Sequence, residues 1–204
     1  MAVPVLITGK SGSGKSASMR TCTDFGIINV LGKPLPFKNE FKTIVTDDYE
    51  RIKAALAKAQ AKSLVIDDAG YLMTNQFMRG HADTGRGNDI FAFYNTIGDN
   101  FWNLLQFINS LPPEKIVYIT MHEDKNDFGD VKPKSIGKML DEKVCIEGMF
   151  TIVLRAVIEG GTHKFKVQSD GLDVCKSPIG MFEEKFIDND LKLVDDKIRE
   201  FYNI

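Results

Sequence analysis

The sequence predicts an α/β fold, a mostly parallel β-sheet flanked by helices, and three apolar runs are the main reason. These runs lie within residues 3–7, 64–66 and 115–124. Nearly continuous apolar runs of this length are typical of strands that are buried on both faces of a parallel sheet. Because 204 residues are enough to enclose one full core, we expect residues 1–204 to form a single domain.

Composition excludes several classes of protein. The three cysteines (Cys22, Cys145, Cys175) are odd in number and widely spaced, which argues against a disulfide framework or a zinc site and favours a reducing cytoplasm. We expect no membrane insertion, because no apolar stretch reaches about 18 residues. The formal net charge of −2 means that charge alone predicts no nucleic-acid partner.

A glycine-rich loop follows the first apolar run. The sequence GKSGSGKS contains Gly-Lys-Ser twice, and only Gly9, Gly14, Lys15 and Ser16 fit the template GxxxxGK[ST]. In such a loop the backbone N–H groups surround phosphate oxygens, the lysine reaches the β and γ phosphates, and the serine hydroxyl can bind Mg²⁺. The predicted ATP-binding residues are therefore Gly9, Gly12, Ser13, Gly14, Lys15, Ser16 and Ala17. We expect residues 16–22 to continue as a helix.

Two aspartates follow the second apolar run. An aspartate at the end of a buried strand beside a phosphate loop can hold Mg²⁺, and we assign this role to Asp67 together with Ser16. Asp68 is the first candidate for the carboxylate that orients the attacking water. Glu40 and Asp47 also lie close to predicted strand ends, so they stay alternative catalytic carboxylates.

The third run leads to His122. The strand predicted over residues 115–124 ends at the edge of the sheet where phosphate would lie, so His122 is a candidate sensor of the γ-phosphate. A histidine just past a strand is equally consistent with an ordinary hydrogen-bonded boundary residue.

The remaining segments are predicted from periodicity and turn residues. Residues 48–61 form an amphipathic helix with Asp48 as N-cap, and a short strand is expected near residues 27–30. Residues 73–88 are polar and predict a mobile loop, whereas apolar spacings of three and four predict a helix over residues 93–111. A last helix begins after Asn189 or Asp190.

A β-hairpin is predicted over residues 149–171, because Gly160 and Gly161 separate two alternating strands. Lys164 and Lys166 lie on one face of its second strand, since strand side chains repeat every two residues. Two aligned cations can reach a phosphate on a neighbouring subunit. A hydrophilic outer face is the commoner explanation for such a pattern.

Two polar segments are candidates for contact with DNA. One carries Arg79 and Arg86, and the other carries Lys132, Lys134 and Lys138. Acidic residues surround the second segment, so a solvated loop explains its charges about as well.

These motifs together resemble phage-encoded AAA-family ATP-binding proteins, which are similar to core-only relatives of RecA. The particular matches beyond the phosphate loop are VIDD at 65–68, YITMHED at 118–124, IGKML at 136–140, EGMFTIVLR at 147–155, KSP at 176–178 and the segment 186–202. The resemblance implies a RecA-like P-loop NTPase fold with the hairpin as a C-terminal antiparallel extension. It also implies ATP hydrolysis with Mg²⁺, and a role in DNA recombination and single-strand annealing.

The same resemblance implies an oligomer with ATP or ADP at subunit interfaces. RecA-like proteins present trans-acting cations from a hairpin such as the one that carries Lys164 and Lys166, and Arg155 is a weaker candidate for that role. Two further functions stay open: a P-loop kinase of a nucleoside or nucleotide, with residues 78–87 as its lid, and a nucleotide-gated binding module that hydrolyses little ATP.

Overall fold

The computed structural model describes residues 1–85, 87–137 and 144–204, and within them it contains one nine-stranded sheet with the order β3-β2-β4-β5-β1-β7-β8-β9 and β6 paired to β5. The six strands from β3 to β7 in this order are parallel. Their bounds are Thr43–Val45 (β3), Phe25–Asn29 (β2), Ser63–Asp67 (β4), Ile116–Lys125 (β5), Val3–Gly9 (β1) and Ile152–Glu159 (β7).

Three strands are antiparallel to their neighbours: β8 (Thr162–Lys166), β9 (Phe186–Asp188) and β6 (Val131–Pro133). Gly160 and Gly161 connect β7 to β8 with φ of 56° and 78°, which favours glycine in a tight hairpin turn. The mostly parallel sheet with its C-terminal antiparallel strands confirms the predicted α/β class and is consistent with a RecA-like P-loop fold.

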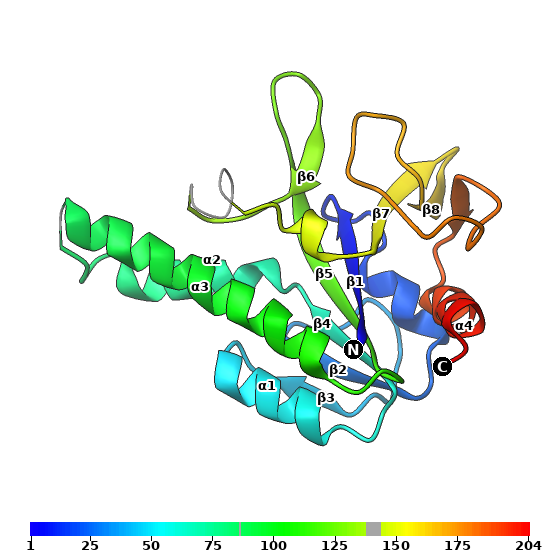
Figure 1. Ribbon diagram of the computed structural model, residues 1–204, viewed down its shortest axis with the longest axis horizontal. Helices are drawn as coiled ribbons and strands as arrows, with labels where there is room; N and C mark the ends of the chain where they lie inside the picture. Colours follow the sequence, from blue (N-terminus) through cyan, green and yellow to red (C-terminus); the bar gives the residue numbers. More distant parts are fainter. Residues whose placement is uncertain (86, 138–143) are drawn as a thin grey trace.

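Helices cover the two faces of the sheet in unequal layers (Figure 1). One face carries α1 (Tyr49–Lys58), α2 (Gly70–Gly80) and α3 (Asn88–Ser110), and the other carries the 3-10 helix η1 (Ser16–Thr21) and α4 (Leu191–Tyr202). A short 3-10 helix, η3 (Glu147–Met149), precedes β7. None of the helices in the described ranges is long and apolar enough to cross a membrane.

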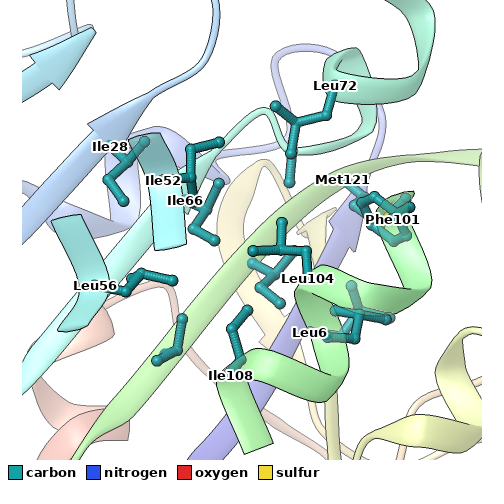
Figure 2. Close-up of a cluster of buried hydrophobic side chains, with 14 of the residues drawn as sticks. Leu6, Ile28, Ile52, Leu56, Ile66, Leu72, Phe101, Leu104, Ile108 and Met121 are labelled. Atoms are coloured by element: carbon teal, nitrogen blue, oxygen red, sulfur yellow. The ribbon is translucent and has the colours of Figure 1, made fainter. Parts of the chain in front are cut away.

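Alternate residues of the buried strands supply the two cores. Leu6 of β1 and Ile66 of β4 pack on the larger layer beside Leu104 of α3, as Figure 2 shows. Their neighbours Val5 and Val65 pack on the opposite face, with residues of η1 and α4. Because both faces of β1 and β4 are covered, these strands read as continuous apolar runs in the sequence.

A buried polar network ties α4 to the start of two central strands. Asp195 is 3% exposed and accepts hydrogen bonds from Ser63 Oγ (2.6 Å) and Tyr118 Oη (2.9 Å). Arg199, one turn further along α4, donates from Nε to Asp195 at 2.9 Å. Each oxygen of this buried carboxylate therefore has a donor, and one donor is a permanent cation.

One local prediction was wrong. The predicted loop at residues 73–88 is mostly helical, because α2 buries Leu72 and Met73 completely and α3 already begins at Asn88. The helix predicted after the phosphate loop is confirmed as the six-residue 3-10 helix η1. The predicted N-cap at Asp48 is confirmed, since its side chain accepts from the Arg51 N–H at 2.8 Å.

Candidate nucleotide-binding site

The predicted phosphate loop connects β1 to η1 at the carboxyl edge of the parallel strands. Gly12 and Gly14 have φ of 78° and 102°, where a side chain would strain the backbone. A Cβ on Gly14 would also lie 2.9 Å from Asn189 Oδ1 and 3.1 Å from His163 Nδ1. The sharp turn of this loop therefore depends on glycine both for its backbone angles and for space.

A cavity of about 350 Å³ lies over this loop. Its lining contains Ser11, Gly12, Gly14, Lys15, Ser16 and Ala17 from the loop and η1, with Lys33, Pro36, Asp68, His122 and His163 from elsewhere in the chain. The structure thus brings together most of the predicted phosphate-binding residues, Asp68 and His122. A larger cavity of about 840 Å³ lies at the opposite edge of the sheet.

Lys15 is held inside the loop. Its ammonium donates to the carbonyl oxygens of Gly9 at 2.8 Å and Lys10 at 2.9 Å, and the residue is 6% exposed. Burial lowers the pKa of Lys15, while the nearby carboxylates of Asp68 and Asp67 oppose that shift. The positive charge therefore lies at the base of the cavity, beside the backbone that would surround a phosphate.

Asp67 ends β4 beside the first residue of η1. Ser16 Oγ lies 3.0 Å from both carboxylate oxygens of Asp67, and Thr120 Oγ1 donates to Oδ1 at 2.8 Å. Asp67 is fully buried. Its burial raises its pKa, and repulsion from the charge of Asp68 raises the pKa further. A buried carboxylate held only by neutral hydroxyls gains stability from a nearby cation.

The oxygen atoms of Ser16 and Asp67 fit a magnesium ion, which prefers hard oxygen ligands and usually takes only one or two of them from the protein. In the described ranges there is no group of three or more His, Cys, Asp or Glu residues that could hold a metal by itself. A metal at this position would therefore share its coordination with nucleotide phosphates, as in other phosphate-loop proteins.

Asp68 occupies an unusual backbone position. Its φ is 58°, a left-handed value that aspartate tolerates better than most residues, and its N–H donates to Thr120 Oγ1 at 2.7 Å. Its side chain is 2% exposed, forms an ion pair with Lys33, and lies 3.8 Å from His122 Nε2. The left-handed turn directs Asp67 and Asp68 to different partners.

His122 lies in β5, three residues before the strand ends at Lys125, in register with Gly9 at the start of the phosphate loop. Burial lowers the pKa of His122, and the charge of Lys15 lowers it further. Its ring packs edge-to-face on Tyr71 with centroids 5.8 Å apart. A neutral imidazole at this position can donate or accept one hydrogen bond within the cavity, so the sensor role stays open.

Glu40 does not lie near the phosphate loop. It precedes β3, which runs parallel to β2, and it lines the larger cavity with Phe25 and Lys58 at the amino edge of these strands. A carboxylate at that edge cannot orient a water at the carboxyl edge, so the alternative assignment of the catalytic carboxylate to Glu40 is wrong in this structure. Asp47, the other alternative, pairs with Arg79.

The predicted trans-acting cations have acidic partners within the chain. Lys164 pairs with Asp188, and Lys166 pairs with Asp170 and Asp173. Because Lys166 is only 4% exposed, the alternative explanation of the pair as a hydrophilic outer face does not hold for Lys166. Arg155 donates to both oxygens of Glu123, at 2.7 and 2.8 Å.

The predicted DNA-contact residues are scattered. Arg79 lies in the last turn of α2 and forms an ion pair with Asp47. Lys134 lines a cavity next to the phosphate loop, together with Lys10 and His122. Lys132 lies on β6. Arg86 and Lys138 lie outside the described residues.

Sequence reasoning missed Lys33 and His163, both of which line the cavity. Lys33 follows a glycine before a Pro-containing stretch, and His163 lies in a hairpin more than 140 residues from the loop that it contacts through Ser13 O at 3.0 Å. The sequence contains no spacing motif that would have linked either residue to the phosphate loop.

Comparison with known families agrees with this geometry. A family model described as an AAA domain matches residues 1–178, so the chain belongs to this family of nucleotide-binding P-loop ATPases. No curated protein matches the chain. The matched region includes the phosphate loop, β4, the aspartates Asp67 and Asp68 at its end, and β5, and it ends before β9 and α4.

Proposed function

We propose that this protein binds Mg-ATP at the phosphate loop and hydrolyses it, and that it works as an oligomer on single-stranded DNA in phage recombination or replication. One observation carries the ATPase proposal. Ser16 and Asp67 are 51 positions apart in the chain, yet their side chains meet at 3.0 Å beside the phosphate loop. A hydroxyl and a carboxylate paired in this place form the usual magnesium site of phosphate-loop enzymes.

The residues of the site divide the work of hydrolysis. Backbone N–H groups of residues 10–16 and the ammonium of Lys15 hold the β and γ phosphates. Ser16 and Asp67 would hold Mg²⁺, which would supply positive charge to the phosphate oxygens. Asp68, buried and fixed through its N–H to Thr120, is the carboxylate positioned to orient water for attack on the γ-phosphorus.

The hairpin of β5 and β6 supports DNA as the partner. It projects beyond the body of the sheet (Figure 1), and Phe128 between its strands is 89% exposed. An exposed aromatic ring can stack favourably on a nucleic-acid base, and the free energy of this stacking depends little on the base sequence. The same β-strand, β5, also carries His122 beside the phosphate loop. A DNA base stacked on Phe128 and the γ-phosphate of ATP near His122 would therefore both act on β5.

The test is phosphate release from ATP at low salt, with and without single-stranded DNA. We expect single-stranded DNA to increase the turnover of the wild type. Lys15→Ala should abolish both turnover and nucleotide binding. Phe128→Ala should keep the turnover measured without DNA and lose the increase caused by DNA. Turnover that is identical with and without DNA, and with no DNA binding, would refute the DNA part alone. Phosphorylation of a nucleoside in a substrate panel would favour the kinase instead.

A further inference from the structure

The connection between β2 and β3 brings a lysine to the phosphate cavity. Lys33 lines the cavity with Lys15, Ser16 and Asp68, and its ammonium forms an ion pair with Asp68. The side chain of Lys33 is 50% exposed, whereas that of Asp68 is 2% exposed. The cation is therefore the accessible member of this pair and can contact a ligand in the cavity.

The backbone of Lys33 is fixed by a buried amide. Asn29, the last residue of β2, is 4% exposed, and its Nδ2 donates to Lys33 O at 2.7 Å. The same side chain accepts from the Gly32 N–H at 2.8 Å, and Gly32 has φ of 66°. The side chain of Asn29 therefore donates one hydrogen bond to this turn and accepts another from it, and both bonds hold the backbone of Lys33 in place.

The register of the sheet decides where this turn lies. Asn29 is the Cα partner of Asp67 in the pairing of β2 with β4. The strand neighbouring the predicted magnesium ligand therefore delivers Lys33 to the same end of the cavity as Asp68. If Ser16 and Asp67 hold Mg²⁺, the terminal phosphate of a bound nucleotide would lie toward that end.

The other candidate cations have different partners. Lys15 donates to two backbone carbonyls at the base of the loop. Lys166 pairs with Asp173, Arg155 pairs with Glu123 of β5, and Lys164 pairs with Asp188. Lys33 combines an accessible ammonium with a position on the cavity wall.

We propose that Lys33 is a catalytic residue that contacts the γ-phosphate of ATP from within the same chain and bridges it to Asp68. The inference rests on the proposed ATPase function. Water attacks the γ-phosphorus while the bond to the β,γ-bridging oxygen breaks, and the electron pair of that bond stays on ADP. One water proton passes to the released phosphate. Lys33 stays protonated and stabilises the charge on the phosphoryl oxygens.

A binding experiment separates this role from a structural one. Titrations with ADP and with a non-hydrolysable β,γ-imido analogue of ATP are compared for wild type, Lys33→Ala and Lys33→Arg. The matched control is Lys38→Ala, which removes the same charge from an exposed position in the same connection. We expect Lys33→Ala to weaken the analogue at least about 10-fold and ADP little, because only the analogue loses a charge-assisted contact. Lys33→Arg should retain part of the preference.

Equal weakening of both nucleotides, or none, would overturn the assignment. Mixing Lys33→Ala with Lys15→Ala tests whether Lys33 acts within its own chain, because a neighbour that carries Lys15→Ala still offers an intact Lys33. We expect no recovered turnover, and recovery would overturn the proposal. If wild type binds neither nucleotide, the proposed function itself fails. If wild type binds and hydrolyses ATP while Lys33→Ala keeps the same preference, only the role of Lys33 fails.

Discussion

The two ends of β4 each meet a buried carboxylate, and the two carboxylates are satisfied in different ways. At the amino end, Asp195 of α4 receives hydrogen bonds from Ser63, Tyr118 and the guanidinium of Arg199. At the carboxyl end, Asp67 receives hydrogen bonds from the neutral hydroxyls of Ser16 and Thr120. Both residues are 3% exposed or less.

The difference separates a structural charge from a functional one. Asp195 has a permanent cation in the next turn of its own helix, so its charge is balanced when the chain folds. Asp67 has hydroxyl donors only, and its pKa is raised by burial and by Asp68. No cation is hydrogen-bonded to Asp67, although the charges of Lys15 and Lys33 act on it from nearby. A further cation from a ligand would stabilise its charged form, and this difference supports the proposal that the carboxyl end of β4 is the binding end.

Asp67→Asn is the substitution with the largest expected effect, and it tests whether Asp67 is the functional carboxylate. The substitution keeps the shape of the side chain and removes the charge that binds Mg²⁺, so we expect turnover to fall by about 10³-fold. The melting temperature without nucleotide should stay the same or rise, because a carboxylate whose pKa is raised by the fold costs stability at neutral pH. Phosphate release and thermal unfolding measure the two effects.

The control for Asp67→Asn is Asp24→Asn, which removes an exposed carboxylate at the amino edge of β2. It should change neither quantity. Asp67→Asn that melts several degrees lower yet keeps its turnover would show that Asp67 is the structural acid.

At the other end of β4, Arg199→Ala should have the opposite profile. Removing the guanidinium leaves Asp195 buried without its cation, which costs about 3 kcal/mol in the free energy of unfolding. Nucleotide affinity should stay unchanged, because the network lies at the far end of the strand from the phosphate loop. Chemical denaturation and nucleotide titration test the two statements.

Lys197→Ala is the matched control for Arg199→Ala, since it removes a positive charge from the same helix at an exposed pair with Glu200. It should change stability by less than about 0.5 kcal/mol. A large loss for Lys197→Ala, or none for Arg199→Ala, would contradict the balance assigned to Asp195.

The smallest expected effect comes from Tyr118→Phe. This change removes one neutral donor from Asp195 while Ser63 and Arg199 remain, so we expect a loss of about 1 kcal/mol. The midpoint of urea unfolding measures it. If Tyr118→Phe destabilised the protein more than Arg199→Ala, the guanidinium would not be the main partner of Asp195.

The sequence predicted the parts of the site that follow a local pattern. The spacing of Gly9, Gly14, Lys15 and Ser16 identified the loop, and the apolar run before Asp67 identified β4. A short motif is readable because each residue binds the same ligand from one continuous backbone segment. The fold class followed for a similar reason, since strands buried on both faces are apolar throughout.

Residues that depend on how distant strands align were not predictable in this way. Lys33 reaches Asp68 only because β2 pairs with β4 and Asn29 shapes the turn after it. Lys164 and Lys166 do alternate as expected, yet a later acidic segment, with Asp170 and Asp173, covers Lys166. Pairing register and loop packing are tertiary properties, and periodicity does not contain them.

The contact between the C-terminal helix and η1 has a practical consequence for anyone who handles this protein. Arg20 donates to Asn189 O at 2.6 Å, and Thr21 donates to Asp190, the N-cap of α4, at 2.6 Å. These two hydrogen bonds join the start of α4 to η1, whereas Arg199 lies further along the helix, near Ser63. We expect a truncation that removes Asn189 and Asp190 to change nucleotide affinity, because it removes these two contacts with η1.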